Sequence, residues 1–294
     1  MPKKVLPIYS IENFNYLGKE TDFYANTLKE QLKSNRQILM PHKHDFFFAL
    51  LITQGSGTHT IDFVNYEVKP GRVFMISPGQ VHDFSLSKDV DGYLFFHTKS
   101  FYDSYSPSKK VQDYPFFCSI YNSPLIVPRN SHLQKIKDLF IEIQNEFEHD
   151  YLMKYRRIHV LAEQLYIDLT RIYLPQKQMD NRNQTYLSKV RKLEDLIDSR
   201  YKKIKSPSEY AKLLFISEKH LNRICKECLN KTTSDLIIDR IMLEAKRMLT
   251  YTNDTVAEIA EQLGYMDNSY FARLFKKRCG KSPAEFAKFA NKGK

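Results

Sequence analysis

The chain has 294 residues and a formal net charge of +11, from 45 Lys and Arg against 34 Asp and Glu. At roughly 100–200 residues per domain, this length predicts two domains that each bury a core. Apolar residues make up 42% and charged residues 27%, which excludes a disordered or fibrous chain. No stretch approaches the roughly 18 apolar residues of a membrane span, and the amino terminus has no apolar secretion signal. We therefore expect a soluble, cytoplasmic protein.

The positive charge is concentrated in the carboxy-terminal part of the chain. Residues 1–174 carry 20 basic and 19 acidic side chains, whereas residues 175–294 carry 25 basic and 15 acidic ones. A strongly basic part beside a near-neutral one indicates that the basic part binds a polyanion such as nucleic acid. A basic surface that only maintains solubility is the alternative.

Short strands are predicted over about residues 8–128. Runs of β-branched and aromatic residues are separated by Gly-Ser-Gly, Val-Asn-Tyr and Pro-Gly turns. These runs cover residues 46–54, 58–63, 72–77 and 92–98. Such close spacing of short strands predicts a small antiparallel barrel or sandwich.

A pair of amphipathic helices is predicted over about residues 131–173. Apolar side chains recur there at helical spacing: Leu133, Ile136, Phe140, Ile143 and Phe147, then Ile158, Leu161, Leu165, Leu169 and Ile172. We expect one side of this pair to pack on the barrel and the other on a second copy of the chain, with packing on the barrel alone as the alternative. Residues 175–186 are polar and aperiodic, which predicts a linker between domains at 1–174 and 187–294.

The basic part contains an internal repeat. Residues 208–232 resemble residues 256–282, with an offset of 49 that becomes 50 at a predicted turn. Each copy is predicted to be a helix, a tight turn and a second helix. Residues 232–251 between the copies are predicted to form one helix. About 18 helical residues at ~1.5 Å each span about 27 Å, close to the roughly 34 Å between successive major grooves on one face of DNA.

The second helix of each copy carries a polar stripe opposite an apolar face. Arg can contact guanine, Asn can contact adenine, and Lys and Ser can bind phosphates, so such a stripe suits a DNA major groove. A solvated face of an ordinary amphipathic helix is the alternative for either copy, but its repetition at matched positions favours DNA. The stripes are Lys219, Asn222, Arg223 and Lys226 in the first copy, and Ser269, Ala272, Arg273 and Lys276 in the second.

The carboxy-terminal part, residues 187–288, resembles the AraC/XylS family of bacterial transcription regulators. The matching strings are YAKLLFISEKHLNRICKE and RIMLEAKRMLTYTNDTVAEIAEQLGYMDNSYFARLFKKRCGKSPAEF. The resemblance implies two helix-turn-helix motifs whose second helices enter adjacent major grooves. It assigns DNA contacts to Lys219, Asn222, Arg223, Lys226, Asn268, Ser269, Ala272, Arg273 and Lys276. Asn230 stands where the family usually has Gly, and Asn tolerates the left-handed conformation required there.

The strings PHKHDFFFALLITQGSGTHTIDF and VKPGRVFMISPGQVHDF resemble the cupin-like sensor domain of many family members. In the family such a domain often binds a small effector, and the following helices often dimerise. We expect His42, His44, Phe48 and His82 to line an effector pocket. The same three histidines resemble the metal ligands of cupin enzymes, although the Glu that usually follows the His-x-His pair is missing.

These patterns together predict an α+β protein with two domains. A cupin-like β-barrel with a helical pair precedes an all-helical domain of two helix-turn-helix motifs joined by a linker helix. The predicted function is that of an effector-responsive transcription activator in the bacterial cytoplasm and nucleoid. Its expected partners are promoter DNA, a small effector, RNA polymerase and a second copy of the chain, with no cofactor and no membrane. A metal-dependent cupin enzyme, or a metal sensor, with an appended DNA-binding module is the alternative.

Overall fold

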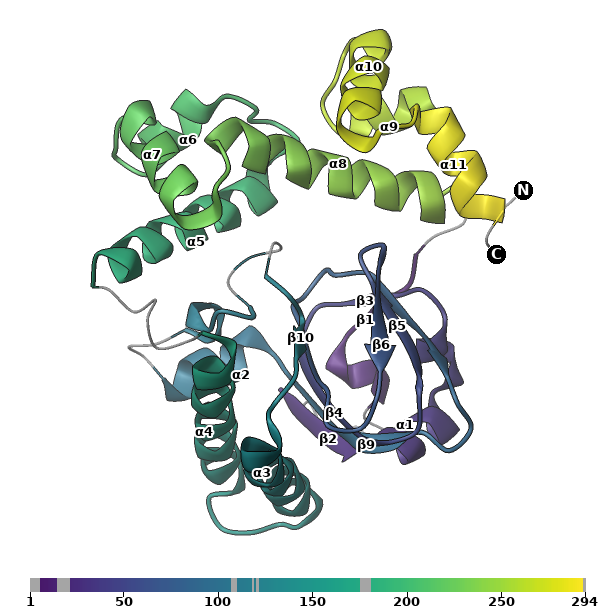
Figure 1. Ribbon diagram of the computed structural model, residues 1–294, viewed down its shortest axis with the longest axis vertical. Coiled ribbons are helices and arrows are strands. Elements are labelled where there is room, and N and C mark those ends of the chain that lie inside the picture. The colour runs from purple at the N-terminus through teal and green to yellow at the C-terminus, as the bar shows by residue number, and fades with distance from the viewer. Residues whose placement is uncertain are drawn as a thin grey trace. The chain divides into compact units, whose positions relative to one another are not determined.

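The computed structural model describes residues 6–14, 22–106, 110–117, 119, 122–174 and 181–292. The chain divides into two domains between Gln178 and Met179. In the described residues, the amino-terminal domain combines β-sheets with helices, whereas the carboxy-terminal domain is built of helices (Figure 1). The predicted α+β class, with a β-barrel domain followed by a helical domain, is confirmed.

Two antiparallel sheets pack face to face in the amino-terminal domain. The larger has the strand order β10-β7-β4-β9-β2 and the smaller β6-β5-β8, and β1 and β3 form a short parallel pair. The larger sheet contains β2 (Phe23–Thr27), β4 (Phe47–Gln54), β7 (Val73–Ile76), β9 (Asp91–His97) and β10 (Leu125–Ile126). The other strands are β1 (Ile8–Tyr9), β3 (Lys43–His44), β5 (Gly57–Ile61), β6 (Val64–Val68) and β8 (His82–Leu86).

Strand β4 is buried on both faces, which explains its uninterrupted apolar sequence. Leu50 and Ile52 point into the core between the two sheets, where Phe84 of the smaller sheet also lies. Ala49 and Leu51 point the other way, into a second core that the helices cover. The large sheet therefore has the core between the two sheets on one side and a helical layer on the other.

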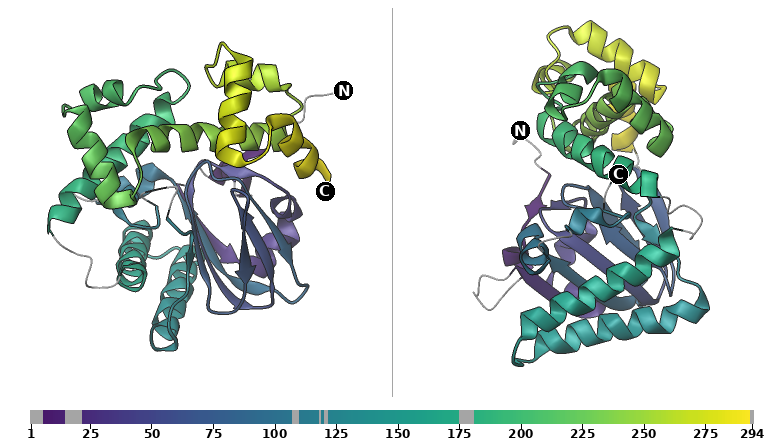
Figure 2. Two further views of the ribbon diagram at one scale, coloured as in Figure 1. Left: turned by 45° about the horizontal axis from the view of Figure 1, so that its top comes forward. Right: turned by 90° about the vertical axis from the view of Figure 1, so that its left-hand side faces the viewer.

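Helices α3 (Asn130–Glu148) and α4 (Lys154–Tyr173) form that helical layer against the larger sheet (Figure 2). Their apolar stripes belong to the same buried cluster as the sheet residues. Packing on the barrel, the alternative considered for these stripes, therefore accounts for them. The shorter helices of this domain are α1 (Leu28–Ser34), α2 (Lys99–Tyr105) and the 3-10 turns Ile11–Phe14, Arg36–Leu39 and Val111–Asp113.

The turn predicted at Val-Asn-Tyr is wrong, because these residues begin strand β6. The chain reverses one step earlier, at Asp62 and Phe63, whose φ angles are 46° and 71°. They join the paired residues Ile61 and Val64. Two left-handed residues in a two-residue loop form a type I′ hairpin turn. Such turns usually contain Asn, Asp or Gly, so the Phe at position 63 did not indicate one.

Capping residues delimit the helices of the carboxy-terminal domain. Ser217 caps α7 and Asp267 caps α10, while Asn230 and Gly280 end these helices with left-handed φ angles of 53° and 76°. The caps repeat at the offset of 50, so the two motifs share one local design. The helices are α5 (Asn181–Arg200), α6 (Pro207–Leu213), α7 (Glu218–Leu229), α8 (Thr233–Tyr251), α9 (Val256–Gln262), α10 (Asn268–Cys279) and α11 (Pro283–Lys292).

The predicted linker is wrong in its second half. Helix α5 begins at Asn181, while residues 175–180 lie outside the described residues. The buried stripe of α5 contains Val190, Leu193 and Ile197, and Tyr186 continues it one turn earlier. A polar first turn hides this start from an analysis of apolar periodicity.

Candidate DNA-binding surface and effector pocket

Helix α7 separates its two faces as the sequence predicts. Leu221, Ile224 and Cys225 are fully buried, whereas Lys219 and Lys226 are exposed on the other face. Pro207, Glu218, Lys219, Asn222, Thr232 and Ser234 line a shallow, solvent-open groove beside the start of this helix. The exposed lysines flank a surface that can approach a phosphate backbone.

Arg223 is exposed but held in place by neighbours that the sequence did not indicate. Its Nη2 donates to the Tyr186 hydroxyl at 3.0 Å and lies 3.1 Å from Nδ1 of His220. The guanidinium also lies 5.9 Å from the centre of the Tyr186 ring. Tyr186 lies in the segment predicted as a linker, so sequence analysis had no reason to place it here.

Asn222 has a structural contact that competes with base recognition. Its Oδ1 accepts a hydrogen bond from the backbone N–H of Thr233 at 3.1 Å, at the first residue of α8. A bidentate contact with adenine uses both the oxygen and the NH2 group of an Asn side chain. Asn222 therefore serves the junction between α7 and α8, and this hydrogen bond restricts how its side chain can turn toward a base.

Helix α10 presents the second polar stripe. Asn268, Ser269, Arg273 and Lys276 are exposed, Ala272 is half-buried, and Phe271 and Phe275 are buried behind them. Within the part of the chain that the structure describes, no ion pair involves Arg273. Its guanidinium is thus freer to reach a base edge than that of Arg223.

The turns of the two motifs differ in one strained residue. Phe215 has a φ of 56° and is 95% exposed, while the corresponding Gly264 has a φ of 79°. A left-handed conformation costs a residue with a Cβ roughly 1–2 kcal/mol, and glycine does not pay this cost. Phe215 buries almost no surface that would compensate.

We expect Phe215→Gly to stabilise the carboxy-terminal domain. Relief of the strain outweighs the extra chain entropy of glycine, which leaves a gain of roughly 0.5–1 kcal/mol in the free energy of unfolding. Denaturant titration followed by circular dichroism measures this gain. A loss of stability would show that the ring makes a stabilising contact in solution.

The predicted effector residues line one cavity in the amino-terminal domain. His42, His44, Phe48 and His82 all face it. Its remaining walls are almost entirely apolar, formed by Phe14, Leu28, Gln31, Ile38, Phe46, Phe84, Leu94 and Phe96. The cavity volume of about 20 Å³ has room for about one water molecule. A drug-sized ligand fills roughly 300–1,000 Å³, so an effector of that size requires the cavity to open.

Hydrogen bonds fix the protonation of the cavity histidines. Nδ1 of His42 and Nδ1 of His44 each donate to a backbone carbonyl, those of Met40 at 2.8 Å and Phe46 at 2.7 Å. Burial lowers the pKa of His42, and it lowers the pKa of His44 to about 3. Both rings are therefore neutral at pH 7 and carry a bare lone pair on Nε2. Nε2 of His44 is buried without a hydrogen-bond partner among the described residues.

His59, which is not among the residues predicted for this pocket, joins the cluster. Its Nε2 lies 3.0 Å from Nδ1 of His82, so one of the two rings donates to the other. Burial lowers the pKa of both rings well below the usual range. Neighbouring strands bring them together, because His59 pairs with Phe84, two residues from His82. The described residues contain no group of three His, Cys, Asp or Glu arranged to hold a metal ion.

The sensor-like barrel and the two helix-turn-helix motifs define a DNA-binding transcription regulator, and family comparisons assign both parts. A model of the AraC-like ligand binding domain matches residues 33–142, and a helix-turn-helix domain model matches residues 210–288. The chain belongs to the AraC family of transcription regulators. None of the described helices is long and apolar enough to span a bilayer.

Several relatives align along most of the chain. The lactose operon transcription activator of Staphylococcus xylosus is 23% identical over 80% of this chain and 81% of its own length. The activator RhaR of Mannheimia succiniciproducens is 22% identical over 83% of this chain and 86% of its own. The crystal structure of ToxT from Vibrio cholerae is 14% identical with a TM-score of 0.44, and the match covers 92% of this chain and 98% of that one.

Proposed function

We propose that the protein is an effector-responsive transcription activator that inserts α7 and α10 into two adjacent major grooves of promoter DNA. The matched polar faces of these helices are the main support for the proposal. Helices α7 and α10 lie on either side of the connecting helix α8 in the chain, and each has its capping residues at corresponding positions. At ~1.5 Å per residue, α8 is about 28 Å long, near the groove repeat of roughly 34 Å. The activator role is supported by the relatives, which are themselves activators.

In this proposal the protein acts in the cytoplasm on nucleoid DNA, as a homodimer that contacts RNA polymerase, and it has no enzymatic activity. Selection of bound sequences from random DNA tests the central claim. We expect one enriched sequence with two conserved half-sites about one helical turn apart. Enrichment of a single short site, or of none, would contradict recognition by two helices.

The cavity of the amino-terminal domain is proposed as the effector site. Its neutral imidazoles offer hydrogen-bond acceptors inside aromatic walls, so a matching effector donates hydrogen bonds from a neutral group such as a hydroxyl. An effector that binds the folded domain raises its unfolding temperature, so thermal shift identifies candidates. A candidate should also change the affinity of the protein for the selected DNA, because binding at two coupled sites is reciprocal.

Arg273→Ala should weaken binding to the selected DNA by roughly 1–3 kcal/mol and relax the preference at one base pair. The exposed guanidinium can contact a guanine edge directly. Affinities for the selected site and for its three single-base variants at each position measure both effects. Lys288→Ala removes one positive charge from α11 and should alter the preference at no base pair. Equal weakening on selected and random DNA would make Arg273 a phosphate contact.

A further inference from the structure

The segment that enters the first helix-turn-helix motif contacts the turn of the second. Lys205 lies in this segment, between α5 and α6, and its ammonium donates three hydrogen bonds to backbone carbonyls. The acceptors are Tyr201 and Lys202, each at 3.1 Å, and Leu263 at 2.8 Å, at the end of α9. The same nitrogen lies 4.7 Å from the centre of the Tyr265 ring. All three N–H donors of the ammonium are used within the protein.

Gly264 allows the two segments to approach this closely. A Cβ at this position would lie 2.0 Å from the carbonyl oxygen of Lys202 and 3.0 Å from the ammonium of Lys205. No side chain fits there without displacing backbone. The turn of the second motif is therefore seated directly on residues 202–205, in what we call the Lys205 contact.

A second link joins the motifs on another side. Arg278 near the end of α10 donates to Asp235 in the first turn of α8 at 2.7 Å. Asp235 also accepts from the backbone and the hydroxyl of Thr232, and these hydrogen bonds together lower its pKa to about 2. The carboxylate stays charged at neutral pH and holds the arginine at the junction that follows the first motif.

These links supplement the covalent connection through α8. Residues 252–255 between α8 and α9 have no regular structure, although α9, α10 and α11 all pack against α8. Within this domain, the first motif lies at one end of α8 and the second at the other (Figure 1). The Lys205 contact bridges them directly and adds a constraint on their rotation that neither α8 nor α11 provides.

We propose that Lys205 is a positioning residue that sets the spacing and rotation between α7 and α10, and thereby the spacing of half-sites that the protein accepts. The inference rests on the proposed recognition of two adjacent major grooves. One added base pair moves a half-site by about 3.4 Å and rotates it by about 34°. A rigid pair of helices cannot follow that movement, whereas a pair that lacks the Lys205 contact can adapt by shifting the second motif on α8.

The test uses full-length protein and the DNA selected from random sequence, with one base pair inserted or removed between the half-sites. The wild-type protein should lose about tenfold or more in affinity on each altered spacing. Lys205→Met should lose only about threefold or less, and its dependence on salt should match wild type, because Lys205 has no donor left for a phosphate. Lys203→Met removes the same charge from an exposed neighbour and should keep the wild-type spacing preference.

Arg278→Gln provides a second variant, because it removes a partly exposed ion pair, a kind that usually contributes little to stability. It should relax the spacing preference in the same direction as Lys205→Met. The proposal is overturned if both variants keep the wild-type spacing preference. It is also overturned if Lys205→Met binds all spacings more weakly by one common factor. Either of these two outcomes would overturn the role of Lys205 but would still be compatible with recognition of two half-sites. A selection that yields no paired half-sites would instead refute the proposed function.

Discussion

The amino-terminal domain should lose about 4 kcal/mol of unfolding free energy between pH 7 and pH 5 from two buried histidines alone. Burial lowers the pKa of His44 to about 3 and that of His97 to about 4. Both are neutral in the folded protein at pH 5, while an unfolded chain binds protons on histidine near pH 6.5. Each group therefore contributes about 2 kcal/mol to the loss.

The unfolding free energy falls with decreasing pH because the unfolded state binds more protons than the folded state. The depressed folded pKa values favour the neutral ring, so the full stability is present above pH 6.5 and falls as the pH drops toward 4 and then 3. His97 is fixed in its neutral form by donating from Nδ1 to the Thr98 carbonyl and accepting the Tyr166 hydroxyl on Nε2. The lowered pKa values of His42, His59 and His82 act in the same direction.

Denaturant titrations of full-length protein at several pH values measure this dependence by circular dichroism. His44→Gln removes one titrating ring and should flatten the slope by about 1.4 kcal/mol per pH unit at most. His132→Gln is the control, because His132 is exposed at the start of α3 and should leave the slope unchanged. If the unfolding midpoint of the amino-terminal domain is constant from pH 7 to pH 5, the buried histidines are hydrated or protonated in the folded protein in solution.

Turn residues and apolar periodicity carried most of the fold prediction. The buried run of β4 and the stripes of α3 and α4 were also visible in the sequence. What escaped were partly exposed elements such as β6 and β8, whose polar residues carry no continuous apolar signal.

Tertiary contacts limited the prediction of the candidate sites. The exposed faces of α7 and α10 follow from helical spacing alone. The contact between Asn222 and Thr233, and that between Arg223 and Tyr186, join residues 11 and 37 positions apart, and no local pattern reveals them. His59 was overlooked for a related reason, because only the register of β5 against β8 brings it to His82.

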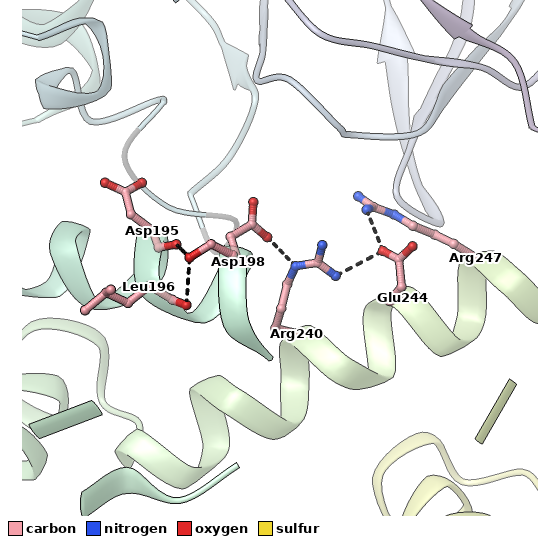
Figure 3. Close-up of polar contacts among 7 residues, drawn as sticks. Asp195, Leu196, Asp198, Arg240, Glu244 and Arg247 are labelled. Atoms are coloured by element: carbon pink, nitrogen blue, oxygen red, sulfur yellow. Dashed lines mark hydrogen bonds and ion pairs between the residues drawn. The ribbon is translucent and has the colours of Figure 1, made fainter. Parts of the chain in front are cut away.

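Glu244→Ala should destabilise the carboxy-terminal domain by about 1.5–3 kcal/mol, the usual value of hydrogen bonds to charged groups. The carboxylate of Glu244 lies between two arginines of the same helix and accepts from Arg240 at 3.0 Å and from Arg247 at 3.3 Å (Figure 3). The side chains of Arg240 and Arg247 are only 13% and 9% exposed. Removing the carboxylate takes a charged acceptor away from both arginines at once, although Arg240 keeps its ion pair with Asp198.

The network also joins α8 to α5. Arg240 pairs with Asp198 of α5 (Figure 3). Its guanidinium also lies 4.3 Å from the centre of the Tyr201 ring. Loss of Glu244 should therefore loosen the whole helical domain rather than one helix. At about 4 °C per kcal/mol, its thermal transition should fall by about 6–12 °C.

Calorimetry of the full-length protein distinguishes destabilisation of the carboxy-terminal domain from destabilisation of the whole chain, because the two domains have separate cores. Only the transition of the carboxy-terminal domain should move, and that of the amino-terminal domain should stay in place. Glu244→Gln keeps one acceptor and the shape of the side chain, so it should cost less than Glu244→Ala. Glu261→Ala removes an exposed carboxylate from α9 and should change stability by no more than about 0.5 kcal/mol. Equal costs for Glu244→Ala and Glu261→Ala would show that water, rather than Glu244, compensates the two arginines.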